Sequence, residues 1–141
     1  MTTLADELRP HVPLLRRFSR ALTGSQEAGD AYVGATLQAI VTAPESLDGS
    51  LSRKAALYKT FLQIWRSIPA NQISDPAEGR SSEHAEERLK TLAPESRQAF
   101  LLVGMEGFER ITAAQIMGVE PIMLDNLITQ AGQEIADQVA T

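Results

Sequence analysis

The side chains that could do chemistry in this sequence are a few hydroxyls, two imidazoles and a run of carboxylates. A serine becomes a nucleophile only beside a base that takes its proton, and a metal ion needs several ligands close together. His11 and His84 lie far apart with no ligand spacing around them. Four serines have no base at hand and fit caps, turns or a linker: Ser25, Ser81, Ser82 and Ser96. We expect no catalytic residues and no metal site.

Other signatures of enzymes and cofactor sites are missing too. The acids Glu83, Glu86 and Glu87 form a run typical of a solvated helix face. The glycines fall at turns or singly in helices, so no phosphate-binding loop is present and no cofactor is expected. The apolar runs are short and no leader pattern begins the chain, so we expect no membrane span and a cytoplasmic protein.

The elements of the first half follow from apolar residues at three- and four-residue spacing. They predict a helix from Val12 to about Gly24. Ser25 can cap a second helix, which Pro44 stops. A third helix is predicted over residues 51–68.

A polar stretch without periodicity, residues 70–82, predicts a linker between two domains, residues 1–69 and residues 83–141. In the second domain Pro94 fits the first position of a helix, and Gly118 marks a turn between two further helices. The last helix is expected to begin near Glu120 or Pro121, and the spacing around Gly118 is typical of a helix-turn-helix. No strand pattern of useful length appears, so the predicted fold is all-α.

The charge of the chain is uneven. Residues 1–70 hold eight basic residues against six acids, whereas residues 71–141 hold five against twelve. No Lys or Arg follows Arg110, although the helix-turn-helix lies in this acidic half. Since phosphate neutralisation supplies most non-specific DNA affinity, we expect that DNA is not a partner.

Two stretches resemble a known family. The sequence "RRFSRALTGSQEAGDAYVGATL" resembles the second region of extracytoplasmic-function sigma factors, and "LAPESRQAFLLVGMEGFERITAAQIMGVEPIMLDNL" resembles their fourth region. The resemblance covers nearly all of the chain outside the linker. It implies two small helical domains like sigma regions 2 and 4, the second with a helix-turn-helix.

The surfaces with which such factors work depart from the family pattern. Ala31, Gly34 and Ala35 stand where Asp, Gln and Glu would dock on RNA polymerase, and small apolar residues cannot replace charge-assisted contacts. Uncharged residues follow Arg66 in place of a basic tail: Ser67, Ile68, Pro69, Ala70 and Asn71. The last helix has these residues where basic groups would face DNA: Asp125, Leu127, Gln130 and Gly132.

This combination resembles the sigma-like domain of PhyR-type general stress regulators. The resemblance implies a sigma-factor mimic that sequesters an anti-sigma factor, NepR-like, by partner switching. In that family a receiver domain follows the mimic. This chain stops at Thr141, before a receiver could begin, so no phospho-acceptor aspartate is assigned to its residues.

The partner-binding residues are expected among apolar groups that replace Arg of the family. Leu62 and Leu127 stand at such positions, with Met123 and Leu124 near the second. If these positions are exposed, they are interface anchors. If instead the leucines belong to the core, changing them would unfold the domain.

Two other functions stay open from the sequence. A divergent extracytoplasmic-function sigma factor would bind RNA polymerase and promoter DNA. An unspecialised helical scaffold unrelated to transcription would bind no anti-sigma factor. The first alternative requires salt-sensitive promoter binding, which separates it from the mimic.

Overall fold

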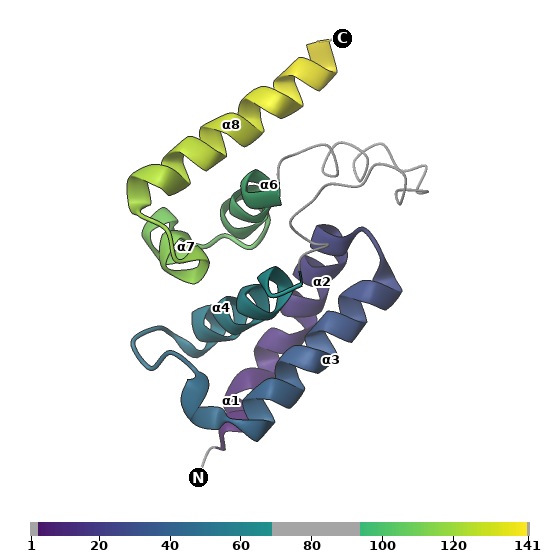
Figure 1. The fold of residues 1–141 in the computed structure, drawn as a ribbon, viewed down its shortest axis with the longest axis vertical. Helices are drawn as coiled ribbons and strands as arrows, with labels where there is room; N and C mark the ends of the chain where they lie inside the picture. Colours follow the sequence, from purple (N-terminus) through teal and green to yellow (C-terminus); the bar gives the residue numbers. More distant parts are fainter. Residues whose placement is uncertain (1–2, 69–93, 141) are drawn as a thin grey trace. The chain divides into compact units, whose positions relative to one another are not determined.

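The computed structural model describes residues 3–68 and 94–140. The chain divides into two compact units, Met1–Ser67 and Ile68–Thr141, which we describe separately (Figure 1). The expected linker, residues 70–82, and the helix expected over 83–93 lie outside the described residues. The described parts contain helices and no strand, so the all-α prediction is confirmed.

Unit 1 is a set of packed helices. Its main contacts join α2 to α3, α3 to α4, and α1 to α4 (Figure 1). The predicted second and third helices are confirmed as α3 and α4, and the first as α2, which α1 and a 3-10 turn precede. The elements are α1 (Leu4–Leu8), η1 (Arg9–His11), α2 (Val12–Thr23), α3 (Gln26–Thr42), η2 (Pro44–Ser46) and α4 (Arg53–Arg66).

Side-chain caps set the helix boundaries in this unit. The Ser25 hydroxyl accepts a hydrogen bond from the Ala28 amide at 3.1 Å, and Ser52 caps α4 in the same way. Gly24 ends α2 with φ of 76°, a left-handed conformation that glycine adopts without strain. The expected cap at Ser25 is thus confirmed.

Aromatic rings fill the core between α2, α3 and α4. Phe18 packs against Tyr58 with ring centroids 5.2 Å apart, and against Phe61 at 5.8 Å. Tyr32 of α3 meets Trp65 of α4 edge to face at 5.0 Å. The Phe18 pairs thus join α2 to α4, and the Tyr32–Trp65 pair joins α3 to α4.

The described part of unit 2, residues 94–140, contains three α-helices and one π-helical turn. The elements are α6 (Pro94–Phe100), η5 (Leu101–Met105), α7 (Arg110–Met117) and α8 (Pro121–Ala140). Pro94 occupies the first position of α6, as predicted. Gly118 has φ of 70° and closes α7, so that the chain turns into α8 and both α6 and α7 pack on α8. The predicted helix-turn-helix is therefore present in α7 and α8.

Candidate protein-interaction site

The outward face of α3 carries no charge over its central turns. Ala31, Gly34 and Ala35 are all exposed, and a Cβ added to Gly34 would meet no atom within 4 Å. In the sigma factors that this sequence resembles, these positions carry polar groups. Here small residues without charge take their place. A partner that needs charge-assisted contacts finds no acceptor at these three positions.

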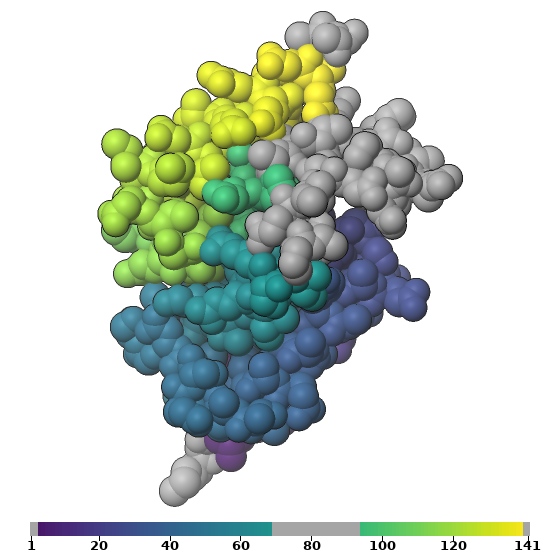
Figure 2. Space-filling model, in the orientation of Figure 1, coloured from purple at the N-terminus to yellow at the C-terminus, as the bar shows by residue number. Residues whose placement is uncertain are grey.

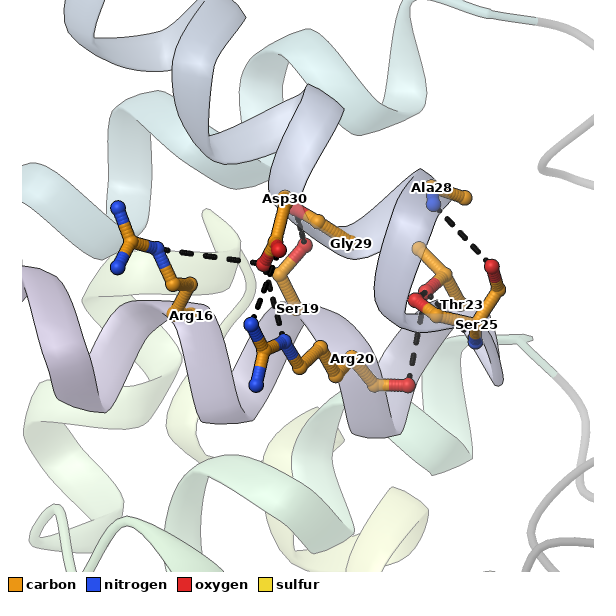
Figure 3. Close-up of polar contacts among 8 residues, drawn as sticks. All are labelled: Arg16, Ser19, Arg20, Thr23, Ser25, Ala28, Gly29 and Asp30. Atoms are coloured by element: carbon orange, nitrogen blue, oxygen red, sulfur yellow. Dashed lines mark hydrogen bonds and ion pairs between the residues drawn. The ribbon is translucent and has the colours of Figure 1, made fainter.

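The acid nearest this face, Asp30, is already paired with α2. Arg20 donates two hydrogen bonds to its carboxylate, both at 2.9 Å, and the Arg16 guanidinium lies 4.0 Å away (Figure 3). The hydrogen bonds from Arg20 lower the pKa of Asp30 below its ordinary value. Asp30 therefore holds the helix pair together as a carboxylate.

Close packing of α2 and α3 fixes how α3 presents its face. The Ser19 hydroxyl donates a 2.8 Å hydrogen bond to the Gly29 carbonyl (Figure 3). A Cβ on Gly29 would lie 2.8 Å from the Arg20 backbone, so only glycine fits there. Thr23 and Ser25 add hydrogen bonds across the turn that joins the helices.

In unit 2 the last basic residue of the sequence is engaged in an ion pair. Arg110, at the start of α7, donates to the Asp125 carboxylate at 2.8 Å. Asp125 is one of the positions where basic residues would face DNA. The pair joins α7 to the second turn of α8. It also compensates the charge of Arg110, at the surface with which the sigma factors that this sequence resembles bind DNA.

The first turn of α8 exposes two apolar side chains, which we call the α8 apolar pair. Ile122 is 73% exposed and Met123 is 45% exposed. The acids Glu120 and Asp125 flank the pair along the chain, and both are exposed. Figure 2 shows that side chains of α8 (yellow-green to yellow) lie on the molecular surface in this view.

The expectation that Leu62 and Leu127 are exposed is wrong. Leu62 is 0% exposed within α4, and Leu127 is 7% exposed. Leu124 is also 0% exposed, because it lies one helical turn from Leu127 on the buried side of α8. Of the four expected partner-binding residues, Met123 alone is exposed.

The sequence carried a signal that would have separated these residues. Leu124, Leu127 and Ala131 follow one another at three- and four-residue spacing, the pattern of an inward helix face, and all three are buried. Ile122 lies off this face. The Arg positions of the resembled family carry no information on which side of α8 is buried.

Unit 1 also has an apolar groove that sequence reasoning missed. It has a volume of about 490 Å³ and lies between the α1–η1 segment and the C-terminal part of α3. Leu4 and Leu8 line one side, and Ile40 and Val41 line the other.

The helix α1, which borders this groove, has a sequence signal at its N-terminus. The signal is the Thr3–Asp6 capping box, which is formed by reciprocal hydrogen bonds.

Among the residues that the structure describes, no group of His, Cys, Asp or Glu is arranged to hold a metal ion. No helix in the described ranges has the length and apolar character needed to span a membrane. The candidate interaction surfaces of the described residues are the uncharged α3 face, the α8 apolar pair with its acidic neighbours, and the apolar groove.

Two sigma-like helical units, the second with a helix-turn-helix whose last helix has no Lys or Arg, define a sigma-like domain. Family models match both units, "Sigma2 domain of PhyR" over residues 8–62 and "Response regulator PhyR, sigma-like domain" over residues 89–138. The chain belongs to the PhyR sigma-like family. The resemblance seen in the sequence is confirmed.

Known relatives agree with this assignment. The phyllosphere-induced regulator PhyR of Methylorubrum extorquens is 46% identical over 131 residues, which are 93% of this chain and 48% of the relative. The PhyR sigma-like domain of Sphingomonas sp. Fr1, solved in complex with NepR, is 40% identical, with a TM-score of 0.77 over 96% of this chain and 88% of that one.

A third relative is the anti-anti-sigma factor PhyR of Bartonella quintana, solved with the anti-sigma factor NepR. It is 32% identical, with a TM-score of 0.81 over 97% of this chain and 51% of that one. This chain thus spans about half the length of the Methylorubrum extorquens and Bartonella quintana PhyR relatives.

Proposed function

We propose that this chain is a sigma-factor mimic that binds a NepR-like anti-sigma factor and so releases a stress sigma factor by partner switching. It acts in the cytoplasm by protein binding, without catalysis and without binding DNA. The relatives support this proposal because two of them were solved in complex with NepR. Since one matching family model describes a response regulator, control by a receiver domain belongs to the same proposal.

One observation carries the proposal: the sigma-like fold is retained while its charged working surfaces are absent. The α3 face exposes Ala31, Gly34 and Ala35, and the last basic residue, Arg110, is paired with Asp125. A sigma factor stripped of these groups keeps the shape that an anti-sigma factor recognises. It loses the contacts that RNA polymerase and promoter DNA require.

The proposed partner contact in unit 2 is the α8 apolar pair, Ile122 and Met123. Two exposed apolar side chains on the first turn of a helix suit an amphipathic partner helix, whose apolar face buries such anchors. The exposed acid Glu120 beside the pair favours Lys or Arg at the rim of that helix. Leu62, Leu124 and Leu127 support the two units from within.

Competition binding tests the function. The NepR-like protein of the same organism is titrated with this chain by calorimetry, and then the preformed complex of that protein with its sigma factor is challenged with the chain. We expect direct binding and displacement of the sigma factor. Absence of binding, or a stable complex of this chain with core RNA polymerase, would contradict the proposal, and the second result would identify a divergent sigma factor.

A further inference from the structure

Methionine is the only sulfur-containing residue type in this chain. The sequence has four methionines and no cysteine, so any two-electron oxidation at sulfur falls on a thioether. Susceptibility to such oxidation follows exposure. The structure describes three of these residues: Met117 is 1% exposed, Met105 is half-buried and Met123 is 45% exposed.

We propose that Met123 is a reversible oxidation site at which a hydroperoxide lowers affinity for the partner helix. The inference rests on the proposed function for its effect on binding, but not for the chemistry itself. It joins two separate observations, the 45% exposure of Met123 and its place in the α8 apolar pair.

The chemistry is an oxygen transfer. A lone pair on the Met123 sulfur attacks the outer oxygen of the hydroperoxide, an S–O bond forms and the O–O bond breaks. Sulfur loses two electrons and becomes a sulfoxide, while the peroxide is reduced to water or an alcohol. Methionine sulfoxide reductases reverse the step, so the change need not be permanent.

The partial exposure of Met123 places this oxidation at the edge of the core. Leu124, Leu127 and Ala131 lie on the buried face of α8, and Met123 lies at the margin of that face, one turn before Leu127, with 45% of the residue exposed. We therefore expect a sulfoxide at Met123 to keep contact with solvent and the fold to be retained. The same change at Met117, which is buried, would place a polar group in the core of unit 2.

The effect on binding follows from desolvation. The sulfoxide carries a strong dipole directly beside Ile122, at the surface that an apolar partner side chain would cover. Covering an unpartnered polar group is costly, and we expect a loss of affinity of about tenfold. Met123→Leu keeps an apolar side chain of similar volume and cannot be oxidised, so it serves as the matched control.

The experiment has two arms. In the first, the chain is treated with limiting hydrogen peroxide, and peptide mass spectrometry follows each methionine with time. We expect Met123 to oxidise faster than Met105, and Met117 to oxidise last. Equal or slower oxidation of Met123 relative to Met105 would overturn the site assignment, whatever the partner proves to be.

In the second arm, calorimetry compares binding of the NepR-like protein to treated and untreated chains. Treated parent should bind about tenfold more weakly than untreated parent, treatment should leave the affinity of Met123→Leu as it was for that variant before treatment, and circular dichroism should be unchanged. Full oxidation at Met123 with unchanged affinity would refute the effect on binding. If the untreated parent fails to bind, the proposed function is wrong, and so is the effect of oxidation on affinity. The assignment of Met123 as the oxidation site is tested by the first arm alone.

Discussion

At the residue scale, Gly29 is a position where α2 and α3 approach closely. Replacing it with alanine brings a methyl group to 2.8 Å from the Arg20 backbone, which cannot move as a flexible side chain would. We expect Gly29→Ala to destabilise the chain by about 1–3 kcal/mol, the usual cost of overpacking. Urea unfolding followed by circular dichroism measures the change.

Gly34→Ala is the matched control, since it makes the same substitution in the same helix. Nothing lies within 4 Å of the added methyl group, and alanine favours the helix over glycine by up to about 1 kcal/mol. Gly34→Ala should therefore be neutral or stabilising. If both variants shift stability alike, the close approach at Gly29 is not what limits that position.

Asp48 holds the loop before α4 through its negative charge. Lys59 donates to one carboxylate oxygen at 2.7 Å, and the Ser50 hydroxyl and amide donate to the other. These contacts, that from Lys59 first, hold the pKa of Asp48 well below its ordinary value. A carboxyl whose pKa is lowered by folding stabilises the protein above its unfolded pKa of about 3.9 and loses that contribution as pH falls through the folded pKa.

The prediction for Asp48→Asn is therefore a pH-dependent loss of stability. The difference between parent and variant in free energy of unfolding should be largest above about pH 5 and should shrink as the pH falls below about 4. Denaturant titrations at several pH values measure it. Glu45→Gln, at a nearby exposed carboxylate, should differ little from the parent at neutral pH. A difference for Asp48→Asn that is constant with pH would contradict the ion-pair account.

At the scale of elements, α8 separates an interface role from a core role. Ile122→Glu places a charge on an exposed position, so the chain should stay folded while binding of the anti-sigma factor weakens by roughly 2 kcal/mol or more. Leu127→Glu buries an unpaired carboxylate and should unfold unit 2. Circular dichroism checks the fold and calorimetry the affinity.

Either of two results would contradict this assignment for α8. A folded Ile122→Glu variant with parental affinity would place the partner elsewhere, and a folded Leu127→Glu variant would show that the buried face has been assigned wrongly. Val139→Glu is the matched control, since Val139 is also exposed on α8 but lies nearly five turns further on. It should change neither fold nor affinity.

The elements predicted from the sequence are those whose ends carry a local chemical signal. Ser25, Pro94 and Gly118 each specify a boundary through their own backbone or side chain, and the structure agrees at all three. The π-helical turn at Leu101–Met105 was not predicted, because it depends on the Glu106 amide bonding the Leu101 carbonyl five residues back. No side-chain type demands that geometry.

The candidate site was predicted less well than the fold. Composition alone showed that basic residues are absent after Arg110, and the pairing of Arg110 with Asp125 adds to that conclusion. The exposure of individual residues was predicted poorly, because it depends on which side of each helix packs against the core. The resemblance indicates that Leu62 and Leu127 stand at Arg positions of the family, but their burial depends on packing that a family pattern does not specify.

At the scale of the whole molecule, the charge distribution argues against DNA as a partner. Residues 71–141 hold twelve acids against five basic residues, so the sigma-like unit that would read a promoter repels phosphate. We expect no sequence-specific binding to the promoter of the partner sigma factor at low salt, as measured by fluorescence titration. That sigma factor with core polymerase is the positive control, and specific binding by this chain that weakens as salt is added would contradict the mimic.

The hairpin of α2 and α3 has a consequence for how unit 1 reaches its native state. Its closing contacts join residues only ten apart in the chain, from Ser19 to Gly29 and from Arg20 to Asp30. The ion pair that holds α1 on α4 joins Glu7 to Arg53, 46 residues away. Local loops close at a smaller entropic cost, so the hairpin should form early in refolding and α1 should dock last. By the same reasoning α1 should exchange its amide hydrogens first, and the apolar groove that it borders would then open and close with it.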